Sequence, residues 1–169
     1  MKRPQTIFVC SMADLFGAWI PDEWIAEVFE ACRKAPQHRY LFLTKNPSRY
    51  LSLAANGLLP EDYNFWYGST ATTPDMEFWW SDRHNTFVSI EPMLAPFPSN
   101  DGAVVKKVDW IIMGAMTGPG STKHQPEREW VASLVQDADS AGVPVFMKDS
   151  LIPVANEAIW RRSLPWEGA

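Results

Sequence analysis

The chain has 169 residues, of which 46% are hydrophobic and 13% aromatic, and its formal net charge at pH 7 is −5. This composition excludes a disordered chain and fits one domain with a hydrophobic core. The acidic total does not support nucleic-acid binding, although a local basic patch remains compatible with it. No apolar stretch is long enough to span a membrane, so we expect a soluble, cytoplasmic protein without membrane association.

The first half of the chain predicts three strands and two helices. Residues 6–11 form a short apolar run without alternating polarity, which is typical of a buried strand. A helix follows over 21–35, where Pro21 suits the first turn and apolar residues recur at helical spacing. This half continues with a strand at 39–44, a short helix at 47–55 and a strand at 64–70.

The second half predicts three more strands. A short helix at 73–82 precedes a strand at 85–92, and a proline-rich loop leads to the strand at 108–115. The glycine-rich stretch GAMTGPG follows, and Gly142 is placed to end the next helix. The remaining elements are that helix at 127–141, a strand at 143–148 and a last helix at 156–164.

Alternating strands and helices predict one α/β domain over residues 1–169 with a parallel sheet. The architecture is either an open doubly wound sheet or part of a (β/α) barrel. Ligands bind at the carboxyl ends of the strands in both cases. Polar residues gather at these predicted ends: Ser11–Asp14, Thr44–Lys45, Gly68–Thr70, Glu91, Gly114–Gly118 and Lys148–Asp149.

The stretch TFVSIEP, residues 86–92, ends an apolar strand on an acid. Glu91 is either a general base or cation ligand in a site, or a carboxylate that pairs with a lysine for structural reasons. Lys45 and Lys148 either bind an anionic group, form a Schiff base, or lie on a solvated rim. We expect one edge of the sheet to hold all three as candidate catalytic residues.

Two further stretches are also compatible with either a ligand-binding role or a structural role. Ser11 and Asp14 either contact a ligand amine or ribose hydroxyl, or cap a turn. The glycine-rich loop that starts at Gly114 either cradles a phosphate or an acidic group with its backbone N–H groups or forms a turn. It is neither a Walker motif nor GxGxxG.

Cysteine and histidine spacing predicts no metal site. The chain has two cysteines, Cys10 and Cys32, without a CxxC pair, and the three histidines lack ligand-like spacing. Neither pattern indicates a disulfide framework, which fits a reducing cytosol. We expect both thiols to be packed, Cys10 in an apolar strand and Cys32 late in a helix.

Six strings, read together, resemble consecutive motifs of a phage-associated bacterial protein family of unknown function. They are IFVCSMADLFGAWIPDEWI, YLFLTKNPSRY, NFWYGST, TFVSIEPML, DWIIMGAMTGPG and GVPVFMKDSL. Full-length members of that family are similar to radical S-adenosylmethionine proteins. The resemblance runs over nearly the whole chain and implies a partial TIM-type (β/α) barrel with about six parallel strands.

The resemblance also implies roles for individual positions. The segment Ser11–Asp14 would contact the methionine amine of S-adenosylmethionine, with Gly114 as a further cofactor-binding position. Strand-end groups would line the pocket: Thr44, Lys45, Ser69, Thr70, Glu91 and Lys148. Met116 stands where relatives tend to have an acid, and a methionine is only a weak acceptor, which argues against an active pocket.

Full-length relatives carry an upstream cysteine cluster that holds a 4Fe–4S cluster, and Cys10 and Cys32 do not match it. We therefore expect a radical-SAM-like barrel fragment that is inactive alone and binds no such cluster by itself. Its substrate is unknown, with a nucleotide or nucleic-acid base as an analogy-based choice. An incomplete barrel predicts self-association or a second polypeptide that supplies the missing segment.

Two alternatives remain open on the sequence. The first is a cluster-independent barrel enzyme that uses Glu91 as a base on a small anionic substrate. The second is a non-catalytic binding subunit.

Overall fold

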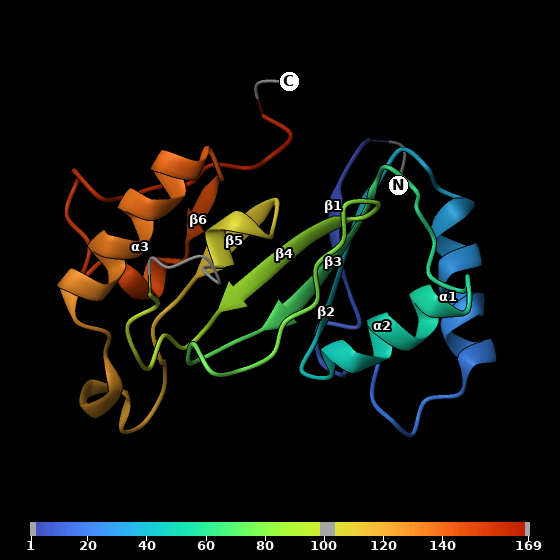
Figure 1. Cartoon of the computed structure of the whole chain (residues 1–169), viewed down its shortest axis with the longest axis horizontal. Helices are drawn as coiled ribbons and strands as arrows, with labels where there is room; N and C mark the ends of the chain where they lie inside the picture. The colour runs from blue at the N-terminus through green and yellow to red at the C-terminus, as the bar shows by residue number, and fades with distance from the viewer. Residues whose placement is uncertain (1–2, 99–103, 168–169) are drawn as a thin grey trace. The chain divides into compact units, whose positions relative to one another are not determined.

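The computed structural model of the chain describes residues 3–98 and 104–167 (Figure 1). Its strands are β1 (Thr6–Val9), β2 (Arg39–Thr44), β3 (Phe65–Thr70), β4 (Asn85–Ile90), β5 (Trp110–Met113) and β6 (Val145–Met147). Its helices are α1 (Asp22–Arg33), α2 (Pro47–Ala55) and α3 (Arg128–Ala141), with short 3-10 helices η1 (Val104–Lys106), η2 (Ser121–His124) and η3 (Asp149–Leu151).

The sheet places its six strands in chain order. The pairings β1–β2, β2–β3, β4–β5 and β5–β6 are parallel, as expected for strands joined by crossover connections. The predicted α/β class and the six-stranded parallel sheet are therefore confirmed. Closure as part of a TIM-type barrel stays a prediction.

The chain forms two compact units. The first comprises Met1–Ser69 with Phe78–Thr86, and the second comprises Thr70–Glu77 with Phe87–Ala169. The first unit contains β1, β2, α1 and α2, and the second contains β5, β6 and α3. The prediction of one domain over residues 1–169 stays a prediction.

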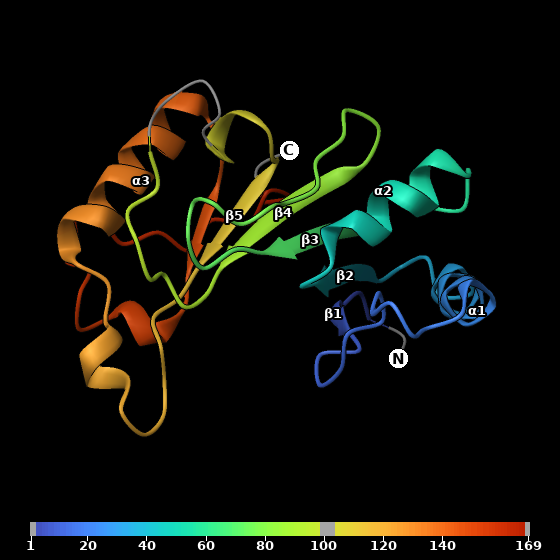
Figure 2. The ribbon, with the colours of Figure 1, turned by 60° about the horizontal axis from the view of Figure 1, so that its bottom comes forward.

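The strands of the first unit lie beside the helices α1 and α2 (Figures 1 and 2). Aromatic residues of these elements form the core of the unit. Phe29 of α1 lies 5.3 Å from Phe42 of β2 and 6.0 Å from Phe65 of β3, measured between ring centroids. Tyr50 of α2 meets the ring of Phe16 edge-on at 4.5 Å. Such offset and edge-to-face pairs stabilise a core beyond their burial alone.

Sequence signals explain where the helices begin and end. α1 begins after Pro21 with two acids in its first turn and ends at Arg33, which complements the helix dipole. Pro47 opens α2 at a position that needs no N–H donor. Gly142 ends α3 in the left-handed conformation, at φ 71°, which glycine adopts without a Cβ clash.

In the second unit, α3 lies beside β5 and β6 (Figures 1 and 2). Its buried residues recur at helical spacing: Val131, Leu134, Val135 and Ala138. The helix predicted at 156–164 is wrong, because this segment consists of turns and of chain that runs along β6. Arg162 forms an antiparallel bridge with Phe146, so this segment covers the outer edge of β6.

The helix predicted at 73–82 is also wrong, since these residues form turns and irregular chain. The backbone N–H of Trp79 donates to Ser69 Oγ at 3.0 Å, and its indole is buried against Tyr67 at 6.1 Å between centroids. These two contacts with β3 hold Trp79 in place, and they do not require a helical conformation.

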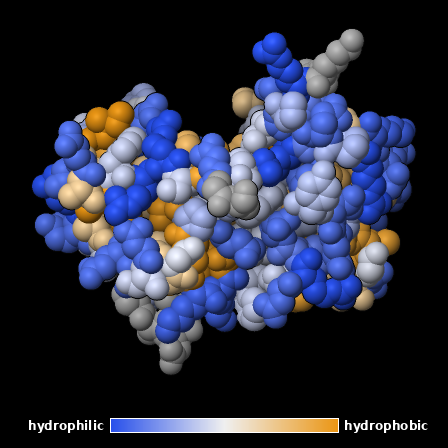
Figure 3. Space-filling model, turned by 90° about the horizontal axis from the view of Figure 1, so that it is seen from above, coloured by the Kyte–Doolittle hydropathy of each residue, from blue (hydrophilic) through white to orange (hydrophobic). Residues whose placement is uncertain are grey.

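Hydrophilic residues dominate the surface seen in Figure 3, where hydrophobic residues form several separate patches. Some large apolar side chains are nevertheless exposed, among them Phe8, Met12 and Trp19 in the first unit. Scattered apolar residues are normal on protein surfaces. No helix in the described parts of the chain is long and apolar enough to cross a membrane.

Candidate functional site

The carboxyl ends of β4 and β6 bring two of the predicted site residues together. Glu91 follows β4, Lys148 follows β6, and Lys148 Nζ lies 2.5 Å from Glu91 Oε2. Glu91 is 28% exposed and Lys148 is 44% exposed, so water reaches both groups. An ion pair of this exposure contributes about 0–1 kcal/mol to stability, so its opening costs little.

Gly114, the residue after β5, makes room for this ion pair. A Cβ at position 114 would lie 2.9 Å from Cδ, Cγ and Oε1 of Glu91, closer than real Cβ contacts occur. The backbone of Gly114 is itself held, because its N–H donates to Ile90 O at 3.0 Å and its carbonyl accepts from Met93 N at 3.0 Å. The glycine therefore lets the Glu91 side chain lie across the end of β5.

The backbone around this edge is anchored on both sides. The N–H of Lys148 donates to Met113 O at 2.8 Å, and the N–H of Ala115 donates to Ser150 Oγ at 3.0 Å. Arg162 forms an ion pair with Asp149, the residue after Lys148. We call Glu91, Gly114 and Lys148 the β4–β6 edge site.

The glycine-rich loop that follows Gly114 forms turns. Gly118 and Gly120 adopt positive φ angles of 92° and 81°. The N–H of Ser121 donates to Gly118 O at 3.2 Å, and the N–H of Lys123 donates to Gly120 O at 3.3 Å. The carbonyls of Gly118 and Gly120 accept these bonds, and the N–H groups of Gly114 and Ala115 donate to Ile90 O and Ser150 Oγ. This arrangement favours the turn interpretation over an anion cradle.

In the first unit, Asp14 holds the loop after β1 against the end of β2. Its carboxylate accepts hydrogen bonds from Thr44 Oγ1 at 2.8 and 2.9 Å, from Lys45 N at 2.9 Å and from Phe16 N at 3.0 Å. The side chain of Thr44 is 1% exposed, so this bond satisfies a buried hydroxyl. The geometry favours the capping interpretation of Asp14, and contact with a ligand stays a prediction.

The other predicted strand-end residues differ in their surroundings. Lys45 and Ser11 are exposed, which suits the solvated-rim interpretation of Lys45. Ser69 is buried and accepts from Trp79, while Thr70, in the second unit, is buried at the end of β3. A shared edge for Lys45 with Glu91 and Lys148 stays a prediction, because Lys45 belongs to the first unit.

The two cysteines do not fit a 4Fe–4S cluster. Cys10 is exposed after β1 at φ 53°, so its predicted burial is wrong: the chain turns there. Cys32 is buried on α1, as predicted, and burial, together with Cys10, raises the pKa of its thiol to about 11. Two thiols are fewer than the three or four that hold such clusters. Among the described residues, no three His, Cys, Asp or Glu side chains are placed to hold a metal ion.

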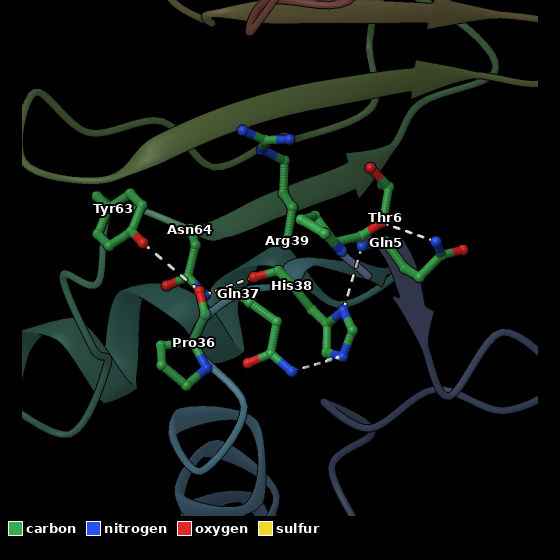
Figure 4. A pocket seen from close by; sticks show the side chains of 9 residues that line it. Gln5, Thr6, Pro36, Gln37, His38, Arg39, Tyr63 and Asn64 are labelled. Atoms are coloured by element: carbon green, nitrogen blue, oxygen red, sulfur yellow. Dashed lines mark hydrogen bonds between the residues drawn. The ribbon is translucent and has the colours of Figure 1, made fainter. Parts of the chain in front are cut away.

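Sequence reasoning missed the role of Gly114 beside Glu91 and a polar pocket at the amino ends of β1–β3. His38 lies in the loop between α1 and β2 and is buried at this pocket (Figure 4). Arg39 at the start of β2 could have indicated this pocket, since it is a charged residue that opens an otherwise apolar strand. Ligands of parallel sheets are expected at the carboxyl ends of the strands, so this expectation did not cover the amino ends, where the pocket lies.

The comparisons with known proteins assign a family. The chain matches the family described as protein of unknown function (DUF5131) over residues 1–153. No curated protein and no solved structure matches the chain. The predicted membership of a family of unknown function is confirmed, while phage association and likeness to radical S-adenosylmethionine proteins stay predictions. The match covers most of the chain, which therefore belongs to the DUF5131 family of proteins of unknown function.

Proposed function

We propose that this chain is the S-adenosylmethionine-binding part of a radical-SAM-like (β/α) barrel protein, and that the β4–β6 edge site binds the amino-acid end of that ligand. The observation that carries this proposal is the Glu91–Lys148 ion pair beside Gly114. The sequence resemblance stated above motivates only the choice of ligand. It implies that Ser11–Asp14 contacts the methionine amine, whereas this proposal assigns the amine to Glu91, because the Asp14 carboxylate already accepts hydrogen bonds within the chain. Both the ligand and the barrel are part of the proposal.

The charges of the β4–β6 edge site fit the methionine group of S-adenosylmethionine. That group carries an ammonium and a carboxylate on one carbon, and the site presents a carboxylate and an ammonium 2.5 Å apart. Binding exchanges one ion pair for two, with Glu91 facing the ligand ammonium and Lys148 its carboxylate. Because the partly exposed pair contributes little to stability, a ligand displaces it at small cost.

When bound, S-adenosylmethionine supplies an activated carbon–sulfur bond. The residues of this chain would bind and orient the ligand: Glu91 and Lys148 through charge, and Gly114 by leaving space. Cys10 and Cys32 do not fit the iron–sulfur cluster that radical SAM proteins use. In this proposal a second polypeptide supplies the cluster, and the isolated chain binds ligand without turning it over.

A series of ligands tests whether the β4–β6 edge site binds the amino-acid end of S-adenosylmethionine. Isothermal titration calorimetry would compare S-adenosylmethionine, S-adenosylhomocysteine and 5′-methylthioadenosine, which lacks the amino-acid group. We expect the first two ligands to bind, and Lys148→Gln to weaken both about tenfold by loss of a charged hydrogen bond. Binding of 5′-methylthioadenosine should be weaker than either and indifferent to the substitution.

Asp139→Asn is the matched control, because Asp139 forms an ion pair with Arg161 in the same unit and is not a residue of the β4–β6 edge site. This variant should leave all affinities unchanged. If 5′-methylthioadenosine binds as tightly as S-adenosylmethionine, or Lys148→Gln changes nothing, the assignment of the amino-acid end is wrong.

A second candidate function is a cluster-independent enzyme, and the 2.5 Å contact between Glu91 and Lys148 is the observation that favours it. A carboxylate within hydrogen-bond reach of an ammonium suits proton abstraction from a small anionic substrate that the lysine binds. The test is proton exchange into small carboxylates in deuterated water, followed by NMR without added iron. Exchange that Glu91→Gln abolishes would favour this alternative, and its absence would remove it.

A further inference from the structure

Residues 161–167, which we call the C-terminal segment, lie along the outer edge of β6 as an added strand would. The segment runs antiparallel to β6 and forms a bridge between Arg162 and Phe146. Two backbone hydrogen bonds of 2.9 Å flank this bridge: the N–H of Met147 donates to Arg161 O, and the N–H of Ser163 donates to Val145 O. The segment therefore pairs with backbone groups that an edge strand otherwise leaves open to other chains.

The C-terminal segment is attached at the surface of the second unit. None of residues 161–167 is buried. Its two ion pairs, Arg161–Asp139 and Arg162–Asp149, join side chains that are all at least 31% exposed. Exposed pairs of this kind contribute about 0–1 kcal/mol each to stability. The segment can therefore leave β6 by a local opening, while the core of the unit stays folded.

Aromatic contacts make the edge selective for this sequence. The indole Nε1 of the buried Trp110 donates to Ser163 O at 3.2 Å, and its ring lies 5.3 Å from that of Trp166, measured between centroids. The guanidinium of Arg162 lies 4.6 Å from the centroid of the Phe146 ring, which is a cation–π contact. The edge of β6 thus fits the chain's own C-terminal segment, and each copy of the chain carries both.

We propose that the outer edge of β6 binds the C-terminal segment of a second copy of the chain, so that two copies exchange their segments. The exchange keeps every contact described above and only moves it between chains, which makes its cost low. Residues 152–160, which join the segment to η3, form turns and irregular chain. When extended they span about 30 Å, enough to reach β6 of an adjacent copy. The exchange uses no residue of the β4–β6 edge site, so it is independent of the function proposed above.

Disulfide formation between two variants of the whole chain tests the exchange. Phe146 and Arg162 form a non-hydrogen-bonded antiparallel pair, and the Cα atoms of such a pair lie close enough for a disulfide. Phe146→Cys and Arg162→Cys are prepared separately in a Cys10→Ser background, mixed and oxidised. We expect a disulfide-linked heterodimer on a non-reducing gel, in an amount that rises with protein concentration. Mass spectrometry of the linked peptides identifies the two cysteines.

Two controls separate exchange from other causes. Leu51→Cys mixed with Phe146→Cys reports disulfides that form by collision, since Leu51 is an exposed residue of α2, and we expect far less heterodimer. A single chain with both Phe146→Cys and Arg162→Cys should form an intramolecular disulfide at low concentration, as the antiparallel pairing requires.

Circular dichroism would first establish that each variant folds. If one of the cysteine variants does not fold, a fluorescein-labelled peptide of residues 156–167 replaces the pair. Its fluorescence anisotropy should rise with the Ser163→Pro chain, whose own segment lacks the N–H that donates to Val145 O. The same peptide with proline at this position should not bind. Three results would overturn the proposal: no more heterodimer than with Leu51→Cys, no intramolecular disulfide in the double variant, or equal anisotropy for the two peptides.

Discussion

Gly114 shows how the absence of a side chain shapes the β4–β6 edge site. Because a Cβ there would lie 2.9 Å from three atoms of Glu91, Gly114→Ala must displace the carboxylate or the end of β5. We expect this variant to lower the free energy of unfolding by about 1 kcal/mol or less, because the partly exposed Glu91 side chain can move away and its ion pair contributes about 0–1 kcal/mol, and we expect it to weaken binding at the site. Urea denaturation measures the first effect. In a Glu91→Ala background the cost should shrink, and an equal cost in both backgrounds would show that Glu91 is not the group displaced.

The two thiols differ in a way that a simple reagent detects. Cys10 is exposed, whereas Cys32 is buried and the pKa of its thiol is raised to about 11. Since the thiolate is the reactive form, we expect Ellman's reagent at pH 8 to modify one thiol quickly and the second only after unfolding. Cys10→Ser should remove the fast phase and Cys32→Ala should leave it. Two fast thiols in the native chain would contradict the structure.

At the residue scale, the sequence predicted the carboxylate and the lysines but not their pairing. Glu91 and Lys148 stand out because each ends an apolar strand, and so does Lys45. Which lysine faces Glu91 depends on sheet order, which places β5 as the neighbour of both β4 and β6. The role of Gly114 depends on the path of the Glu91 side chain, which no local pattern encodes.

At the scale of the elements, two buried tyrosines of the first unit make the free energy of unfolding decrease at high pH. Tyr50 donates to Phe42 O at 3.1 Å and Tyr67 donates to Pro60 O at 2.8 Å. Burial raises the pKa of both hydroxyls above their ordinary value. Near pH 10 the unfolded chain releases these protons while the folded chain retains them, so the free energy of unfolding falls as pH rises further.

Denaturation curves measured from pH 8 to 11 would test this dependence. Tyr67→Phe should reduce the slope above about pH 10, where one tyrosine contributes about 1.4 kcal/mol per pH unit. Tyr63→Phe is the matched control, because the Tyr63 side chain is 79% exposed, and its slope should equal that of the unmodified chain. If Tyr67→Phe leaves the pH dependence of the free energy of unfolding unchanged, Tyr67 does not account for the loss of stability at high pH.

Elements with strong local signals were predicted closely, and those fixed by distant contacts were not. The strand at 39–44 and the helix at 47–55 were predicted with the bounds that the structure has. Their signals lie within or next to each element: the apolar content of the strand, and Pro47 and Asn56-Gly57 at the two ends of the helix. The helices at 73–82 and 156–164 were wrong. The first segment is held by Trp79 against β3, and the second runs along the edge of β6. Both arrangements depend on residues far away in the chain.

At the scale of the whole molecule, the two ends of the sheet order differ. β6 is covered by the segment around Arg162, whereas β1 is a short strand whose residues alternate between exposed and half-buried. Phe8 of β1 is 39% exposed, and such an edge is a template for pairing with another strand. We propose that β1 associates with a second copy of the chain or with another polypeptide.

Light scattering over a range of protein concentrations tests this association. We expect assemblies larger than a monomer, and we expect Phe8→Lys to shift them toward the monomer because a charge on an edge strand opposes pairing. Leu51→Lys, which changes an exposed apolar residue on α2, serves as the control and should leave the assembly unchanged. A monomer at all concentrations, with cooperative unfolding, would contradict self-association and leave a partner polypeptide as the remaining form of the proposal.

The most direct test of the central claim is the dissociation constant of S-adenosylmethionine for the chain and its Glu91→Gln variant. Glu61→Gln is the matched control, since Glu61 is an acid of the first unit that pairs with Arg83. We expect saturable binding that Glu91→Gln weakens about tenfold, through loss of a charged partner for the ligand ammonium, and that Glu61→Gln leaves unchanged. No binding by the unmodified chain, or equal affinities in all three proteins, would contradict it.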